Sequence, residues 1–264
     1  MGQILDTVKS SANARLRSLI GSGARRKLQR KAELWRLLAD YLEKTRSTGC
    51  SYSDYWELYQ AVRARKPREI LECGTGTSTL VMAFALCENE REGCPGRITS
   101  MEELDEYYRM ARGLLPVSLQ PYVELVHSPT VEDCYSLFRG VRYRDVPSRP
   151  YDFVFVDGPK PTAPSDGMTT FDYDFLHVLK HSDHEVYGLV DKRVSTCYVL
   201  QKVLGVDKVR YDSLLHLGFV GPCTRRDLKT IGTPPSSSFT GATRVFGNAE
   251  LRMRLVPHAE TPDR

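Results

Sequence analysis

One segment of the chain, EILECGTGTS, restricts the possible folds more than any other. An apolar run ends in an acidic residue, two glycines come next, one residue apart, and small hydroxyl side chains open a helical pattern. Glycines at this spacing let the backbone turn sharply and approach a ligand closely. The helix after the turn directs its free amides and the positive end of its dipole at the turn. The segment therefore predicts a nucleotide-type site at the carboxyl end of a parallel strand, around Glu72, Gly74, Gly76, Thr77 and Ser78.

Apolar strand-like runs and helical patterns alternate from residue 69 onward. This alternation is typical of a parallel sheet that is covered by helices on both faces. We expect a doubly wound α/β fold with a mostly parallel, seven-stranded sheet and an N-terminal helical extension. The expected strands are 69–73, 97–101, 122–126, 151–156, 186–190, 209–217 and 219–224, and the last two are candidates for antiparallel strands. The expected helices are 52–65, 78–87, 104–114, 131–138, 171–180 and 194–204, with loops at 140–150 and 159–169.

The charge of the chain is unevenly distributed. Residues 1–48 hold eleven Lys/Arg and four Asp/Glu, a net charge of +7, which leaves −3 of the total of +4 for the remainder. A length of 264 residues fits one α/β domain with a terminal addition. We expect a basic N-terminal helical extension over residues 1–50, the main domain over 51–228, and a tail over 229–264 with an edge-strand candidate at 251–255.

The N-terminal segment is predicted to hold one amphipathic helix over residues 26–44, after a mobile stretch over residues 1–25. The apolar side of this helix is expected to cap the sheet or to contact a neighbouring subunit in an oligomer, and peripheral contact with an anionic membrane is the alternative. Nucleic-acid binding through the basic run at 25–31 is a minor alternative, because no stacking platform accompanies it. The apolar side consists of Leu28, Leu34, Trp35, Leu38 and Tyr41.

The seven cysteines are scattered and include no CxxC pair. No secretory leader pattern opens the chain, and no apolar run approaches membrane-spanning length. We therefore expect reduced cysteines and a cytoplasmic location. Cys73 lies inside the glycine turn, where a small packing residue is the expected role.

The identity of the nucleotide depends on the residues after the two glycines. A dinucleotide fingerprint has a third glycine where this chain has Thr79, and no Gly-Lys-Ser/Thr is present after the turn, so a phosphate-binding loop is excluded. The pattern Glu72-x-Gly74-x-Gly76-x-Ser78 instead resembles motif I of the class I S-adenosylmethionine-dependent methyltransferases. The resemblance covers residues 50–222 and implies S-adenosyl-L-methionine as the cofactor.

A second acidic residue, Glu102, ends the next expected strand. A carboxylate at this place can accept both hydrogen bonds of a ribose diol. Glu103 is the alternative if the strand ends one residue later, and a helix N-terminal acid without a ligand is the structural alternative. By analogy with the family, Ser128 is expected near the adenine, and Tyr52 and Tyr55 are expected to close over the cofactor.

The segment YDFVFVDGPK resembles the strand-four motif of small O-methyltransferases of the catechol type. In that branch the aspartate is a metal ligand beside the sulfonium and the acceptor, and a lysine three residues later is the base. The resemblance assigns these positions to Asp157 and Lys160. The next strand brings Asp191, but Lys192 stands where the branch has an asparagine ligand. A cation there repels a divalent ion or replaces it, so we expect a metal-independent or only weakly metal-dependent relative, with Asp157 and Asp191 as the candidate metal ligands.

These observations predict methyl transfer to an oxygen or nitrogen of an unidentified acceptor, expected to be a small molecule. The alternatives are an aminopropyltransferase and a non-catalytic cofactor-binding or scaffold protein with the same fold. Zinc binding by three histidines near a helix end is not favoured, because a helix C-terminus already stabilises imidazoles. These histidines are His177, His181 and His184.

Overall fold

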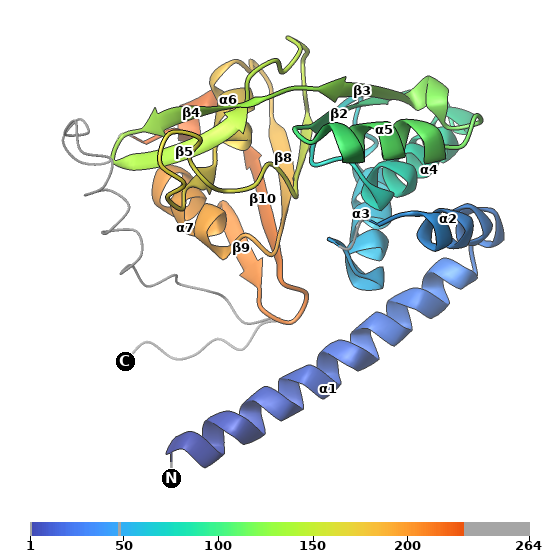
Figure 1. Ribbon diagram of the computed structural model, residues 1–264, viewed down its shortest axis with the longest axis horizontal. Helices are drawn as coiled ribbons and strands as arrows, with labels where there is room; N and C mark the ends of the chain where they lie inside the picture. Colours follow the sequence, from blue (N-terminus) through green and yellow to red (C-terminus); the bar gives the residue numbers. More distant parts are fainter. Residues whose placement is uncertain (1, 47–48, 230–264) are drawn as a thin grey trace.

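The computed structural model describes residues 2–46 and 49–229 (Figure 1). Seven strands form the central sheet in the order β3-β2-β1-β6-β8-β10-β9, and only β10 runs antiparallel to its two neighbours. The predicted doubly wound, mostly parallel sheet of the class I methyltransferase type is therefore confirmed. The strands are β1 (Glu69–Cys73), β2 (Arg97–Glu102), β3 (Val123–His127), β6 (Phe153–Val156), β8 (Val186–Asp191), β9 (Val209–Asp212) and β10 (Leu217–Cys223).

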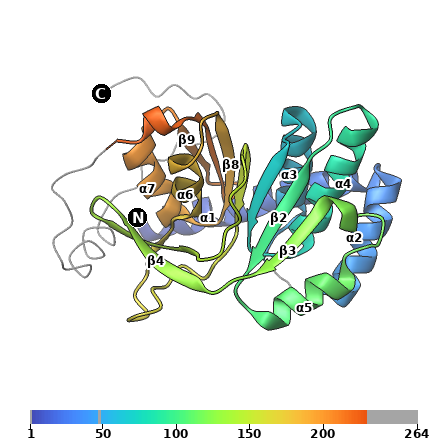
Figure 2. The same cartoon turned by 90° about the horizontal axis from the view of Figure 1, so that it is seen from above.

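Helices cover both faces of this sheet (Figure 2). Successive strand side chains point to opposite faces, so Ile70 and Phe155 join the core on one side while Leu71 and Val156 join the core on the other. The first core includes α3 (Tyr52–Arg65) and α4 (Thr77–Arg91), and the second includes α6 (Asp174–Lys180) and α7 (Val194–Leu204). The short α5 (Asp105–Leu114) comes after β2, and 3-10 turns lie at η1 (Gln120–Tyr122) and η2 (Arg225–Asp227).

Two helices lie before residue 45 where one was expected. Helix α1 (Gly2–Gln29) is a long rod in Figure 1, and α2 (Ala32–Lys44) begins after a short turn. The prediction of a single helix over residues 26–44 was wrong, because α1 already covers residues 2–29 and a turn separates it from α2. Leu28 and Leu34 are six residues apart, roughly 120° around a continuous helix, and with the turn between them both are buried in the same core. Because Leu38 and Tyr41 are buried there too, the apolar side of α2 packs inside the protein.

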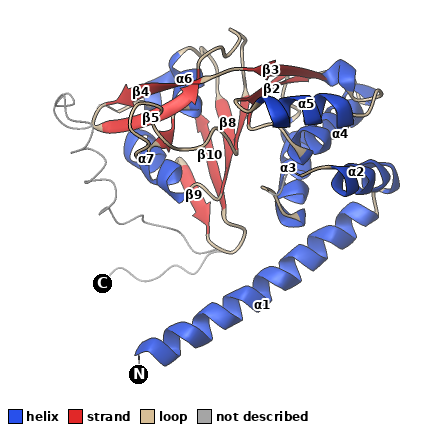
Figure 3. Ribbon diagram, in the orientation of Figure 1, coloured by secondary structure: helices blue, strands red, loops and turns tan. Residues whose placement is uncertain are grey.

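A second, three-stranded sheet comes after β3 (Figure 3). It consists of β4 (Thr130–Tyr135), β5 (Phe138–Tyr143) and β7 (Phe171–Asp172). The helix expected at 131–138 was therefore wrong, the loop expected at 140–150 begins only after Tyr143, and the helix expected from residue 171 begins at Asp174. The spacing of Val131, Tyr135 and Phe138 resembles a helical face. These residues instead pair within the antiparallel hairpin of β4 and β5, and β7, a distant segment, pairs with β5.

The strand expected at 209–217 is shorter, because β9 ends at Asp212 and a turn over residues 213–216 leads into β10. The remaining expected elements agree with the structure to within a few residues at their ends. The edge-strand candidate at 251–255 lies outside the described residues, and the division of the chain at residues 50 and 228 stays a prediction. Within the described residues, no helix combines the length and the apolarity needed to span a membrane.

Candidate functional site

The glycine turn after β1 lies directly against the turn after β6. Gly74 has φ +97°, and a Cβ on it would lie 2.9 Å from the backbone nitrogen of Gly158. The Asp157 amide donates to the Cys73 carbonyl (2.8 Å), and the Gly74 amide donates to the Met101 carbonyl (3.0 Å). The carboxyl ends of three parallel strands thus meet where the strand order reverses, which is the place where open α/β sheets bind ligands.

Glu72 lies beneath this turn and does not line the cleft above it. Its carboxylate is fully buried and accepts hydrogen bonds from the hydroxyls of Ser78 (2.6 Å), Thr79 (2.6 Å) and Ser100 (2.7 Å). Burial raises the pKa of Glu72 to about 7, and the three hydroxyl donors oppose this rise. Glu72 therefore supports the turn from below. Thr79, which breaks the dinucleotide fingerprint, is one of the residues that donate a hydrogen bond to the Glu72 carboxylate.

The raised pKa of Glu72 has a consequence for stability. The pKa of about 7 in the folded protein lies above the ordinary value of 4.5, so folding favours the protonated carboxyl. This contribution is fully present below pH 4.5 and is lost as the pH rises through about 7. Glu72→Gln cannot titrate, so the stability of the wild type relative to this variant is expected to fall by up to about 3 kcal/mol between pH 5 and pH 8. Urea unfolding of both proteins at the two pH values measures the difference, and a pH-independent difference would contradict the assignment.

Two adjacent acids mark the end of β2. Glu102 is 5% exposed and accepts hydrogen bonds from the amides of Thr75 (3.3 Å) and Leu104 (2.9 Å). Burial raises the pKa of Glu102 to about 7, and the neighbouring Glu103 adds to the rise. Glu103 instead accepts hydrogen bonds from the Tyr143 hydroxyl (2.8 Å) and the Lys160 amide (3.0 Å). Glu102 therefore braces the glycine turn, and Glu103 braces the loop after β6.

Asp157 comes directly after β6 and is covered by a segment from the N-terminal part of the chain. The Cys50 thiol donates to Asp157 Oδ2 (3.4 Å), and a Cβ on Gly49 would lie 2.7 Å from the same oxygen. Burial raises the pKa of Asp157, against the lowering effect of the Arg193 guanidinium. Burial also raises the pKa of Cys50, so its thiol stays protonated and is a donor.

A cleft of about 260 Å³ lies between these turns. Of the predicted catalytic and cofactor-binding residues, it is lined by Gly74, Gly76, Thr77, Ser78, Glu102, Asp157 and Lys160. The side chain of Tyr55 lines it as well, whereas Tyr52 packs against the rings of Trp35 and Tyr55. Ser128 is fully buried beside the cleft, where its hydroxyl accepts a hydrogen bond from the Asp145 amide (2.9 Å).

Arg193 is a lining residue that the sequence did not single out. Its guanidinium donates to the carbonyls of Asp157 and Pro159 and forms an ion pair with the buried Asp172 (2.7 Å). It thereby fixes the backbone on which Asp157 and Lys160 lie. A basic residue two positions after a strand-end aspartate is the only sequence signal for this role.

Asp191 and Lys192 lie behind the cleft, with Asp54 from the first turn of α3. Lys192 Nζ is 3.6 Å from Asp191 Oδ2 and 4.0 Å from Asp54 Oδ2, and it donates a hydrogen bond to the Gly49 carbonyl. Burial raises the pKa of Asp191 to about 8, and the negative charges of Asp157 and Asp54 add to the rise. The position that the sequence questioned as a metal site thus holds an ammonium group.

Two other parts of the protein, a group of histidines and a second hollow, are less favourable as functional sites. His181 Nδ1 is 2.8 Å from the His177 carbonyl at the end of α6, as the helix-end role predicts. His184 lies beyond the helix, and its ring nitrogen Nε2 is 3.1 Å from the Tyr151 carbonyl instead. A larger hollow of about 690 Å³, lined by Arg68 and Arg97, lies at the amino ends of β1 and β2. That edge of the sheet is opposite to the glycine turn.

No protein-family model and no curated protein matches the chain. Matches to 41 chains of solved structures were found. A putative class I S-adenosylmethionine-dependent methyltransferase from Listeria monocytogenes is 13% identical, with 86% of this chain and 79% of that one covered and a TM-score of 0.44. A Podospora anserina methyltransferase with S-adenosylhomocysteine bound is 14% identical, with 76% and 73% covered and a TM-score of 0.36.

A putative protein-L-isoaspartate O-methyltransferase from Plasmodium falciparum, in complex with S-adenosyl-L-homocysteine, is similar at 9% identity. The match covers 64% of this chain and 82% of that one, with a TM-score of 0.40. The strand order β3-β2-β1-β6-β8-β10-β9 defines the fold of this chain independently of these low identities.

Proposed function

We propose that the chain binds S-adenosylmethionine in the switch-point cleft and transfers its methyl group to an oxygen or nitrogen of a small molecule. The observation that carries the proposal is the convergence of Gly74, Glu102 and Asp157 around one cleft, each at the end of a different parallel strand. In this proposal Gly74 lets the amino-acid part of the cofactor approach the backbone, and Glu102 accepts the ribose hydroxyls.

The charges around the cleft support a cationic rather than a phosphorylated ligand. Glu102, Glu103 and Asp157 all line it, beside the amino end of α4. Of the two cations in the lining, Lys160 and Arg193, Arg193 is already paired with Asp172. A phosphate at that helix end would meet several carboxylates at short range, and like charges repel strongly in a poorly solvated site. A sulfonium centre is instead attracted by Asp157.

Asp157 is the better placed of the two predicted catalytic residues. Its carboxyl group lies inside the cleft with a raised pKa, and such a carboxylate is a stronger base once it is ionised. Lys160 is exposed at the cleft, and the structure gives its backbone amide a partner. In the proposed reaction Asp157 accepts the proton of a hydroxyl acceptor, and alignment of the acceptor with the methyl group supplies much of the acceleration.

Calorimetric titration with S-adenosylmethionine and S-adenosylhomocysteine tests the core of the proposal. We expect saturable binding of both, with NAD and ATP as controls that do not bind. A folded protein that binds neither adenosyl compound would overturn the proposal. Labelled methyl transfer to the small-molecule fraction of a cell extract then separates an enzyme from a protein that only binds the cofactor. Tighter binding of decarboxylated adenosylmethionine would favour the aminopropyltransferase.

A further inference from the structure

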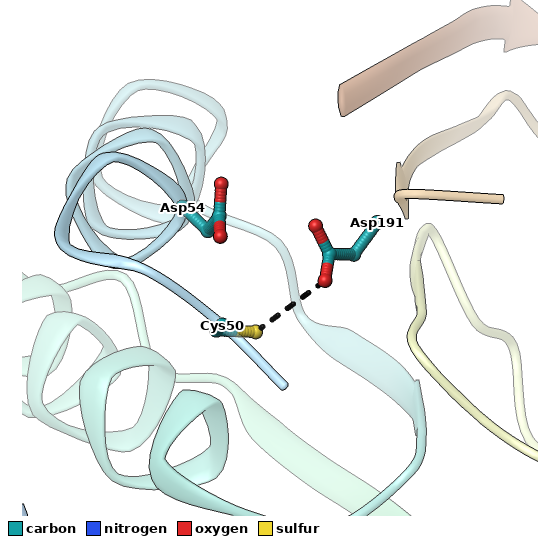
Figure 4. A group of neighbouring side chains, drawn as sticks. All are labelled: Cys50, Asp54 and Asp191. Carbon is teal, nitrogen blue, oxygen red and sulfur yellow. Dashed lines mark hydrogen bonds between the residues drawn. The ribbon is translucent and has the colours of Figure 1, made fainter. Parts of the chain in front are cut away.

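The side chains behind Asp157 form a compact cluster of potential cation ligands. Cys50 and Asp54 lie at the start of α3, Asp191 lies at the end of β8, and their ligand atoms lie within 4.8 Å of one another (Figure 4). Asp54 and Asp191 are each 1% exposed. Two carboxylates at this depth destabilise the fold unless a positive group or a hydrogen-bond donor accompanies them.

The carboxylates have unused acceptor capacity. Asp54 Oδ2 accepts the Ser51 amide (2.6 Å) in the capping box of α3, but Asp54 Oδ1 is buried without a hydrogen-bond partner among the described residues. Asp191 Oδ1 is also buried without a hydrogen-bond partner among the described residues. Oxygen atoms of this kind, converging from two elements, are ligands for a cation.

Lys192 brings its ammonium group to this cluster. The distances of 3.6 Å to Asp191 and 4.0 Å to Asp54 make it the cation that faces both carboxylates. The backbone of Lys192 is in the left-handed region, with φ +52°, and its amide donates to the His216 carbonyl (2.8 Å). A non-glycine residue in this conformation costs free energy, so the surrounding contacts must maintain it.

The ammonium group also reaches the wall of the cleft. It donates to the carbonyl of Gly49, and Gly49 and Cys50 are the residues that cover Asp157. We propose that Lys192 is the built-in cation of the Asp54–Asp191 cluster, excludes divalent ions from it, and positions the 49–50 wall against Asp157. The positioning part rests on the proposed function, whereas the exclusion of divalent ions does not.

Mn²⁺ titration followed by electron paramagnetic resonance tests the exclusion, with Lys192→Met as the variant of similar length and no charge. We expect no Mn²⁺ binding to the wild type up to about 1 mM. Lys192→Met is expected to bind Mn²⁺ at least about tenfold more tightly than this limit. Lys192→Arg keeps the charge and is expected to behave as the wild type. Lys192→Met combined with Asp191→Asn is expected to lose the gained site.

Equal Mn²⁺ binding by the wild type and Lys192→Met would overturn the exclusion, as would a folded Lys192→Met that binds none. Tight Mn²⁺ binding by the wild type would be sufficient to overturn the exclusion of divalent ions, even if Lys192→Met does not fold. The affinity for S-adenosylhomocysteine tests the positioning role. Lys192→Met is expected to lower this affinity by about tenfold, and Lys192→Arg is expected to keep the affinity of the wild type. Unchanged affinity in Lys192→Met would overturn the positioning role. A wild type without cofactor binding would remove the proposed function and leave the Mn²⁺ comparison valid.

Discussion

Gly158→Ala is expected to abolish binding of S-adenosylhomocysteine and to lower the free energy of unfolding by about 2–3 kcal/mol. A Cβ at this position would lie 2.7 Å from Gly74 Cα and 2.8 Å from Gly74 N. These are backbone atoms, so relief of the overlap requires the two turns to separate. Separation displaces Asp157 and the glycine turn together, and the cleft between them changes shape.

The matched control is Gly113→Ala on the exposed side of α5, where an added Cβ meets no atom within 4 Å. There we expect a gain of up to about 1 kcal/mol from helix propensity and unchanged cofactor affinity. Denaturant unfolding and calorimetry measure both quantities. A Gly158→Ala protein with wild-type stability and affinity would show that the contact between the turns is not needed.

Glu102→Ala is expected to weaken S-adenosylhomocysteine binding by about 100-fold, because a hydrogen bond to a charged group contributes about 1.5–3 kcal/mol. The loss has two parts. The ribose loses its acceptor, and the amides of Thr75 and Leu104 lose the carboxylate that orients the turn. With the pKa of Glu102 raised to about 7, binding by the wild type is also expected to weaken as the pH falls below 7.

Glu103→Gln is the control for this experiment, since Glu103 is the adjacent acid and accepts hydrogen bonds from the Tyr143 hydroxyl and the Lys160 amide, whereas the glycine turn donates to Glu102. We expect a smaller loss of affinity in this variant than in Glu102→Ala. The reverse order of effects would identify Glu103 as the ribose partner and reject the assignment of Glu102.

Much of the sheet was predictable because each strand and its terminal residue are encoded locally. An apolar run that ends in an acid places Glu102 and Asp157 at the carboxyl edge whatever the rest of the chain does. The observed strand ends differ from the expected ones by only a few residues, except for the strand expected at 209–217.

The errors occurred where local spacing misleads or where partners are distant in sequence. The 131–138 segment forms β4 and the start of β5, a local hairpin that its helix-like spacing conceals, and only the pairing of β5 with β7 is distant in sequence. Cys50 lies 107 residues from Asp157, and Arg193 lies 36 residues from the same residue. No local pattern predicts such contacts. The sequence did raise the question of Lys192, because a cation among acidic strand ends is visible without any structure.

The contact between Gly74 and Gly158 divides the cleft into two parts that can change independently in evolution. The floor is made of main chain pressed against main chain, so substitutions there are restricted whatever the acceptor. The wall at Cys50 and the rim at Lys160 are made of side chains, which mutation can exchange without moving the floor. Diversification of acceptor choice among relatives of this chain is therefore expected at the wall and rim, above a floor whose shape is constant.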